Sequence, residues 1–403
     1  MKHNIILHRL GNLMPAAFAA NMAIILLSVP ALGGLKNMDF TYDAHVFAFA
    51  WSAQWRFGSS LAFNLSERNE FNDKLSMQWT SFNIQSMGDP VPWQAGRSPL
   101  ALGTGHYDST ILNHDIPGFD ILRYSFTFWG IEYDKFAAFL DGKDRILFGH
   151  RFGGDFFQGR LELHAQELCL AAGEYDSLFN NPLPFVPYYL LQHVFLQEKE
   201  LNNANINIMW AFDWKYKMPD TSQIYGEIFI DDLKSPFDAD DRTVPTRLAG
   251  LIGYGKPDLF VQKDVFRFEY ARANRFTYSH WQPGTDFILD GECMGHGMGS
   301  DADNLTLEYR FPAGSGRMLG IKCQYERHGE GEIGDRWDHT MPPLQFLTGI
   351  VEIRRVFDIG YYVSSGRGEF YFLGSAGTIA NQDHSPGAED VIAYIKTGLT
   401  VKL

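Results

Sequence analysis

Residues 206–218 read INIMWAFDWKYKM, and this stretch decides the fold. Every second position is apolar and mostly aromatic: Ile206, Ile208, Trp210, Phe212, Trp214, Tyr216 and Met218. The positions between them include Asn207, Asp213, Lys215 and Lys217. Successive side chains of a β-strand point to opposite faces, so the pattern predicts a strand with an aromatic face and a largely polar one.

The same alternation recurs along the chain, at residues 47–56, 122–128, 266–278, 305–311, 319–326 and 391–403. A soluble β-sandwich also alternates, but its strands are typically about 5–6 residues long and its hidden face favours Val, Ile and Leu. Here the segments run to roughly 10 residues and their apolar faces are rich in Trp, Tyr and Phe, which is typical of strands that face lipid. The sequence therefore predicts an all-β fold, a single antiparallel transmembrane β-barrel of roughly 16–18 strands with few short helices.

The composition suits a barrel and excludes other classes of protein. Of 403 residues, 33 are Phe, 18 are Tyr and 9 are Trp, and the formal net charge is −14. A groove for nucleic acid needs clustered positive charge, so no nucleic-acid partner is expected. The three cysteines are too few and too scattered for a disulfide framework or a zinc site.

The amino terminus has the parts of a secretory signal peptide. Lys2 and Arg9 give a basic start, residues 10–34 are uncharged and rich in Ala, Leu and Ile, and small residues surround Ala31. We expect a signal peptide at residues 1–31 and the outer-membrane barrel domain at residues 32–403. The alternatives are an uncleaved membrane anchor and a segment of the mature protein. Pro15 and Pro30 weigh against the anchor because proline interrupts a spanning helix.

Two acidic motifs are candidate ligand sites. Asp231 and Asp232 could bind sugar hydroxyls or a cation, or form a solvated strand end. Neighbours on a strand point to opposite faces, so this pair cannot flank one glycosidic bond as a catalytic acid and base must. Residues 295–303 are glycine-rich and predict a shaped connection, in which Asp301 and Asp303 either cap their own turn or, with His296, contact a ligand.

Aromatic and arginine side chains supply the other candidates. Carbohydrate binding needs aromatic platforms for C–H faces and planar polar groups for hydroxyls. Arg275, His280 and Trp281 occur together near the end of a predicted strand and fit that chemistry, while a Trp in a barrel also serves at the membrane interface. The sequence contains no motif for a metal site or an activated nucleophile, so we predict no metal ion, no cofactor and no catalytic residue.

Four motifs resemble the capsule assembly protein Wzi family, whose members are outer-membrane barrels that act as surface lectins for capsular polysaccharide. The motifs are NNPLPFVPY at residues 180–188, YGEIFIDD at 225–232, YARANRFTYSH at 270–280 and GHGMGSDAD at 295–303. The resemblance implies a barrel of about 18 strands in the outer membrane, with a role in holding exported capsule chains at the cell surface. The family's larger members also carry a helical bundle, for which this sequence shows no substantial segment.

The predicted function is a non-enzymatic barrel in the cell outer membrane, in contact with outer-membrane lipid. It binds capsular polysaccharide or exopolysaccharide and helps to attach or assemble it at the cell surface. A general porin, with a lumen of mixed charge as its aqueous path, is the first alternative. An outer-membrane enzyme acting on lipid or polysaccharide is the second, and it requires a carboxylate, Ser or His constellation that converges in one cleft.

Overall fold

The structure is a computed structural model. It describes residues 35–43, 46–57, 61–71, 75–86, 91–114, 116, 118–140, 145–173, 186–189, 205–232, 245–282, 284–338, 341, 345–366 and 368–402. The predicted signal peptide, residues 1–31, lies outside the described residues. In the parts that the structure describes, no helix combines the length and the apolar character needed to cross a membrane.

Eighteen strands form one antiparallel sheet. They are β1 (Leu35–Asp43), β2 (Val46–Phe57), β3 (Leu61–Phe71), β4 (Leu75–Ser86), β5 (Trp93–Ser98), β6 (Phe119–Phe128), β7 (Ile131–Phe139), β8 (Arg145–Phe156), β9 (Leu161–Ala172), β10 (Ile206–Lys217), β11 (Gln223–Asp232), β12 (Arg247–Pro257), β13 (Val265–Ala273), β16 (Ala302–Pro312), β17 (Arg317–His328), β18 (Glu352–Ser365), β19 (Gly368–Ala380) and β20 (Glu389–Lys402). A separate two-stranded hairpin consists of β14 (Ile288–Leu289) and β15 (Glu292–Cys293), and the 3-10 turn η2 (Gln382–His384) precedes β20.

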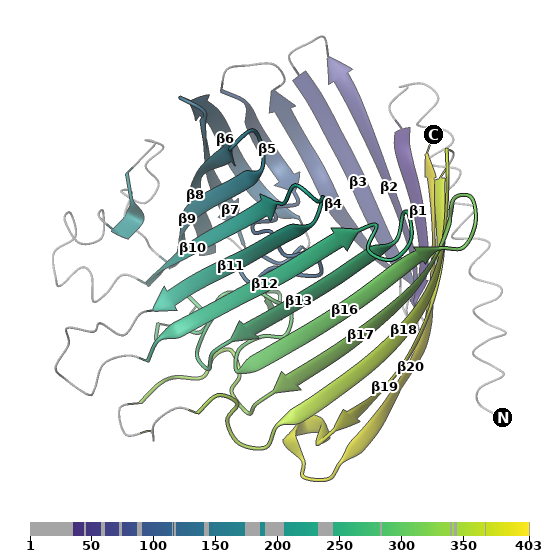
Figure 1. Ribbon diagram of the computed structural model, residues 1–403. Coiled ribbons are helices and arrows are strands. Elements are labelled where there is room, and N and C mark those ends of the chain that lie inside the picture. The colour runs from purple at the N-terminus through teal and green to yellow at the C-terminus, as the bar shows by residue number, and fades with distance from the viewer. Residues whose placement is uncertain are drawn as a thin grey trace.

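The sheet closes on itself. Each strand pairs with its neighbour along the chain, β13 pairs with β16, and β20 pairs with β1, where Phe40 lies opposite Leu399. Figure 1 shows the tilted strands curving around a common interior, with β10 to β18 nearest the viewer. Closure satisfies the backbone groups of both edges, so none of the eighteen described strands of the barrel is left with an unpaired edge. The predicted antiparallel barrel of roughly 16–18 strands is confirmed.

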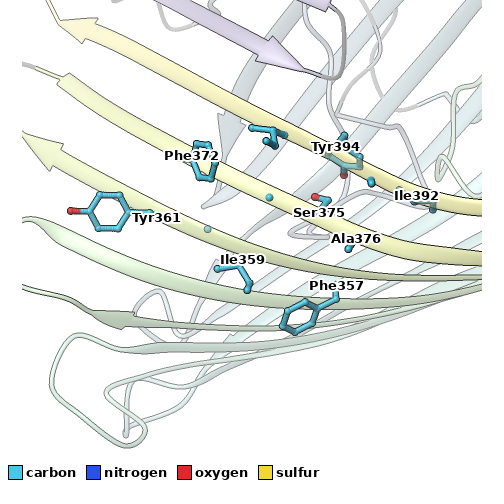
Figure 2. Close-up of a pocket in the computed structure, with 12 residues that line it drawn as sticks. Phe357, Ile359, Tyr361, Phe372, Ser375, Ala376, Ile392 and Tyr394 are labelled. Carbon is cyan, nitrogen blue, oxygen red and sulfur yellow. The ribbon is translucent and has the colours of Figure 1, made fainter.

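The alternation of side chains sorts them between the outside and the lumen. On β10, Trp210 and Phe212 are exposed on the outer face, whereas Met209, Ala211 and Asp213 are buried on the inner face. The other strands repeat this outward display of large apolar side chains at Leu122, Phe128, Ile228, Ile252, Leu307, Ile321, Phe357, Ile359, Phe372 and Ile395. Figure 2 shows a hollow across β18, β19 and β20 whose lining includes several of these outward residues, such as Phe357 and Ile359. The outer wall is thus an apolar surface suited to hydrocarbon.

One part of the outer wall carries polar side chains beneath a covering segment. Glu167 accepts hydrogen bonds from the backbone N–H groups of Tyr188 and Tyr189, at 2.7 and 2.9 Å. His150 lies beside them, with its Nε2 2.9 Å from Glu167 and its ring stacked on Tyr188 at 5.0 Å between centroids. Residues 186–189 therefore cover polar groups that would otherwise face lipid, where an unpaired charge is costly.

The two ends of the barrel differ. Because the strands are antiparallel, the longest connections (residues 99–118, 173–205, 233–246, 274–301 and 329–351) all leave and re-enter the wall at the same end. We call this the loop end; it lies at the lower left in Figure 1. The opposite turn end has tight connections such as 129–130 and 313–316, and β1 begins and β20 ends there.

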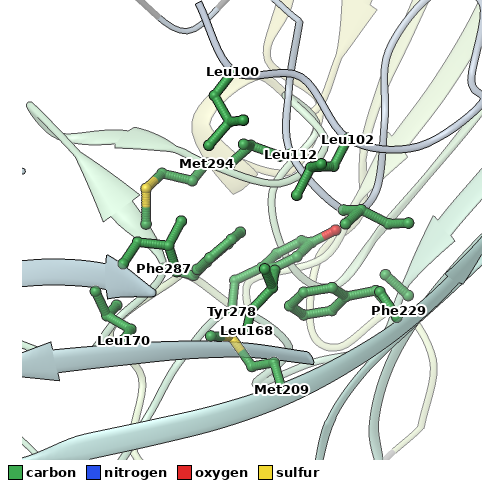
Figure 3. Close-up of a cluster of buried hydrophobic side chains, with 14 of the residues drawn as sticks. Leu100, Leu102, Leu112, Leu168, Leu170, Met209, Phe229, Tyr278, Phe287 and Met294 are labelled. Carbon is green, nitrogen blue, oxygen red and sulfur yellow. The ribbon is translucent and has the colours of Figure 1, made fainter. Parts of the chain in front are cut away.

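Two of the long connections fold back into the barrel. We call the described residues of connections 99–118 and 274–301 the luminal plug. Its apolar side chains form one buried cluster with inward-facing residues of the wall (Figure 3), including Leu100, Leu102, Leu112, Tyr278, Phe287 and Met294 of the plug and Leu168, Leu170, Met209 and Phe229 of the wall. Full burial of one such side chain contributes about 1.5–3 kcal/mol, so the cluster holds the plug firmly against the wall from β6 to β13.

Candidate functional site at the loop end of the lumen

One carboxyl group of the wall accepts several hydrogen bonds from the first plug connection. Glu227 on β11 accepts hydrogen bonds from the backbone N–H groups of Thr104 and Gly105, both at 2.6 Å, and of Thr110 at 2.7 Å. The hydroxyl groups of Ser109 and Thr110 donate to it as well, at 3.0 and 2.8 Å. Glu227 is thereby the acceptor that replaces the hydrogen bonds this loop would otherwise make to water.

Two further carboxyl groups continue the attachment around the wall. Glu269 on β13 accepts from the N–H groups of His106 and Tyr107 at 2.7 and 3.2 Å, and from the hydroxyl of Tyr225 at 2.8 Å. The hydroxyl of Tyr107 donates to Glu308 on β16 at 3.1 Å. Burial beside Glu308 raises the pKa of the Tyr107 phenol well above its usual value, so it remains a donor. Sequence reasoning did not assign these roles, although alternation had placed Glu269 and Glu308 on the polar face.

The predicted residue Asp231 holds the second plug connection. Its Oδ1 accepts from the Asn207 side chain at 3.0 Å, and its Oδ2 accepts from the backbone N–H of Tyr278 at 3.0 Å. The backbone of Asp232 lies opposite Arg247 beyond a bulge in the β11–β12 register, and its side chain lies outside the described residues. Asp231 therefore faces the lumen and is occupied by protein partners.

His280 and Trp281 sit side by side in the second plug connection but differ in exposure. His280 is buried, and its Nδ1 lies 2.8 Å from the Thr285 hydroxyl. Burial lowers the pKa of His280 to about 3, and the nearby Arg247 adds to this effect, so the imidazole is neutral. Trp281 is 61% exposed. The next residue, Gln282, accepts from the N–H of Ile206 at the start of β10, which places this pair at the loop end.

Residues 295–301 of the glycine-rich stretch form the last part of the plug. His296 is buried, and its Nδ1 accepts from the N–H of Met298 at 3.2 Å, while Asp108 Oδ2 lies 3.6 Å away. Desolvation lowers the pKa of His296 to about 4. Because the Nδ1 lone pair is used by an N–H donor, we regard the contact with Asp108 as one to a neutral ring and not as an ion pair.

Asp301 and Arg275 tie the plug to connection 329–351. Asp301 Oδ2 accepts from the N–H groups of Gly331 and Thr348, at 3.1 and 3.0 Å. Arg275 pairs with Asp335 at 3.1 Å and also lines a hollow of about 230 Å³ with Arg272 and residues 345–346. Arg275 is therefore the predicted residue that combines an ion pair with access to a surface hollow.

Asp303 lies on the outer face of the wall. It begins the outward-facing series of β16, and it accepts from Arg327 Nε and Nη2 at 3.0 and 2.6 Å. The hydroxyl of Tyr270 donates to the same carboxylate at 3.0 Å. This bidentate ion pair between Asp303 and Arg327 forms part of the outer rim of the barrel at the loop end.

The described candidates all lie at the loop end, but they do not converge on one cleft. Asp231, His280, His296 and Asp301 contact protein groups within or beside the plug, Asp303 faces outward, and Arg275 and Trp281 retain accessible surface. Among the described residues, no three His, Cys, Asp or Glu side chains are grouped as metal ligands.

These features define the class of protein. A closed antiparallel barrel with an aromatic outer face, a polar inner face and its long connections at one end is an outer-membrane β-barrel. The loop end is then the extracellular end, because such barrels have short periplasmic turns and longer extracellular loops.

Comparison with known proteins gives the particular relationship. The family model described as capsule assembly protein Wzi matches residues 185–351. The fold is similar to that of Wzi from Escherichia coli, with a TM-score of 0.65 and 13% identity, covering 94% of this chain and 87% of that chain. That protein is described as an outer-membrane protein involved in group 1 capsule assembly and as a carbohydrate-binding β-barrel. The resemblance to the Wzi family and the location in the outer membrane, both predicted from the sequence, are confirmed.

A second solved structure supports the same architecture. OccD3 of Pseudomonas aeruginosa has a TM-score of 0.52 and 7% identity, covering 92% of this chain and 91% of that chain. No curated protein matches the sequence. At these identities, the likeness to solved structures establishes the fold.

Proposed function

We propose that this barrel binds capsular polysaccharide or a related exopolysaccharide at the cell surface and helps to attach or assemble it, without catalysing a reaction. The observation that carries the proposal is the luminal plug: buried wall carboxyl groups hold it at the end that faces the cell exterior. A lumen occupied in this way provides a fixed, polar surface for a ligand. The match to the Wzi family supports polysaccharide as that ligand.

The predicted residues contribute to this function in two ways. We propose that Trp281 and Arg275 contact the polysaccharide, since an exposed indole offers a platform and an arginine offers planar donors. Asp231, His280, His296 and Asp301 act indirectly by holding the plug, and Asp303 braces the rim through Arg327. Asp232 is proposed as a further contact at the same end. The apolar outer wall contacts outer-membrane lipid, and residues 1–31 direct export.

A deletion strain tests the binding role. We expect cells that lack the protein to release polysaccharide into the medium, and cells complemented with the full chain to retain it. Trp281→Ala and Arg275→Ala should restore retention incompletely, whereas Trp129→Ala should restore it fully, because Trp129 is an exposed indole at the turn end. Unchanged surface polysaccharide in the deletion strain would refute the proposal.

The porin alternative has a specific basis in the structure. Inward-facing ion pairs such as Lys322–Asp358 and Arg267–Glu308 make part of the lumen hydrophilic. Purified protein in planar bilayers distinguishes the two functions. We expect no steady current because of the plug; a steady ohmic current would support a porin instead.

A further inference from the structure

A polar cleft opens in the lumen on the side of the wall away from the main plug contacts. It has a volume of about 360 Å³ and is lined by Asn304, Gln324, Glu326, Arg354, Ile392 and Tyr394, together with residues 356 and 379. We call it the mouth cleft. Its volume falls within the range of about 300–1,000 Å³ found for small-ligand sites.

The register of the strands shows that the cleft lies on the inner face. Asn304 lies opposite Glu326, and Glu326 lies opposite Arg354, so these three side chains form one row across β16, β17 and β18. Thr306 and Glu308, two and four positions beyond Asn304, share its face, and Glu308 contacts the plug. Alternation therefore places the row in the lumen. Asn304 and Arg354 are each the third residue of their strands counted from the loop end, which puts the cleft near the extracellular mouth.

A second row of inward-facing residues borders the hollow of the mouth cleft. Gln324 lies opposite Val356, Val356 opposite Gly377, and Gly377 opposite Ile392. Gly377 has no side chain, and Val356 and Ile392 on either side of it line the hollow on the inner face. Tyr394, two residues after Ile392 on β20, lies on the same face and lines the same hollow. An aromatic ring beside a hollow is the platform that the C–H face of a sugar requires.

The polar groups of the cleft retain hydrogen-bonding capacity. Glu326 Oε2 accepts from the Asn304 side-chain amide at 2.9 Å, which orients both groups. Arg354 lies 3.9 Å from Glu326 and 3.9 Å from Glu352, beyond hydrogen-bond length, so its guanidinium can donate to a ligand. A carboxylate, two amides and a guanidinium together provide both acceptors and donors for a ring that carries several hydroxyl groups.

The plug reaches the edge of the mouth cleft. The glycine-rich stretch 295–303 leads directly into Asn304 near the start of β16. The plug and the cleft are therefore parts of one surface at the extracellular mouth.

We propose that the mouth cleft is a subsite for one pyranose residue of the bound polysaccharide, with Tyr394 stacking on the ring and Asn304, Gln324, Glu326 and Arg354 bonding its hydroxyl groups. This assignment rests on the proposed function and gives it a location. The ligand is a hydroxyl-rich sugar: a neutral pyranose, or a uronic acid whose carboxylate pairs with Arg354.

The test measures binding of the full-length barrel, in detergent, to the immobilised surface polysaccharide of the producing strain. Oligosaccharides from mild acid hydrolysis of that polysaccharide serve as competitors. We expect Tyr394→Ala to weaken binding at least tenfold and Glu326→Gln to weaken it several-fold. Ile392→Trp removes no polar group but fills the hollow of the mouth cleft, and we expect it to weaken binding as strongly as Tyr394→Ala. The matched control is Tyr371→Ala, which removes a tyrosine of β19 near the turn end.

The outcomes separate the subsite from the function. Only variants that show the heat-dependent shift in gel mobility of a folded barrel are compared. If Tyr394→Ala does not fold, Ile392→Trp and Glu326→Gln still test the subsite. If wild type binds and all folded cleft variants bind as tightly as Tyr371→Ala, the subsite is wrong and the proposed function stands. If wild type itself does not bind the polysaccharide, the proposed function fails and the subsite fails with it.

Discussion

His296 shows how burial controls charge at the scale of a single residue. Its ring accepts one hydrogen bond from the backbone N–H of Met298, and its surroundings include Asp108 and Glu326. Desolvation outweighs the opposing effect of Glu326 and holds the pKa at about 4, below the usual value of about 6.5. The folded plug therefore contains a neutral imidazole at neutral pH.

Because His296 is neutral in the folded plug, we expect the protein to lose stability in acid. Below about pH 6.5 the unfolded chain binds a proton at His296, whereas the folded plug binds it only near pH 4, so the free energy of unfolding falls as the pH decreases between these values. For one histidine the loss is on the order of 2–3 kcal/mol. We expect His296→Asn, which keeps an acceptor, to lose less stability than wild type between pH 7 and pH 4.5 in thermal unfolding.

His114→Asn is the matched control, because His114 is an exposed histidine of the first plug connection. It should follow the wild-type pH dependence. An acid sensitivity of His296→Asn equal to that of wild type would show that the ring is not kept neutral by burial.

At the scale of elements, the two plug connections are held in the lumen by hydrogen bonds to carboxyl groups of the wall strands. Wall strands supply carboxyl groups, and the connections supply backbone N–H groups that have no partner in a strand or helix. Glu227 alone receives three such N–H groups and two hydroxyl groups. Its position on the inner face follows from alternation, but its partners lie more than a hundred residues earlier in the chain.

Removing this acceptor should release the first connection. Glu227→Ala leaves three N–H groups unpaired, two of them buried, and each buried one costs about 1–3 kcal/mol, so the connection should dissociate from the wall. We expect protease cleavage within residues 99–114 of the folded barrel, together with a measurable current in planar bilayers.

Glu292→Ala, which alters an exposed carboxylate in the plug hairpin, should remain resistant to protease and electrically silent. If Glu227→Ala behaves in the same way, the apolar cluster around Leu112 and Tyr278 holds the plug without the carboxyl group.

At the scale of the whole molecule, the antiparallel order sends all the longest connections to one end. The plug, the mouth cleft, Trp281 and the rim pair Asp303–Arg327 all lie there. The proposed function requires these groups at the extracellular face, and the barrel topology provides that arrangement.

Epitope insertion tests this orientation. A tag inserted at Pro386, in the connection between β19 and β20, should be labelled by antibody on intact cells, because that connection is at the loop end. A tag inserted at Ser315, in the connection between β16 and β17, should be labelled only after the outer membrane is permeabilised. Labelling of Ser315 on intact cells would reverse the assignment of the two ends.

The strands themselves could be predicted from the sequence because their signal is local. The alternation at residues 206–218 defines two faces, and the aromatic side chains on one of them identify its environment as lipid. The resemblance to the Wzi family could likewise be recognised from short motifs. The predicted residues at 231, 280, 296 and 301 have polar side chains that serve the plug, and their residue types alone do not distinguish a ligand contact from a structural contact.

What the sequence determined by itself was therefore the barrel: strands with one apolar and one polar face have to close on themselves in a membrane, since no water is present to satisfy an open edge. What only the tertiary structure decided was the content of the lumen. The plug forms where Glu227, Glu269 and Asp231 meet N–H groups from distant connections, and the mouth cleft forms where a row of polar side chains from β16, β17 and β18 lies beside Gly377. Neither leaves a local pattern, because the partners become neighbours only when the sheet curves and closes.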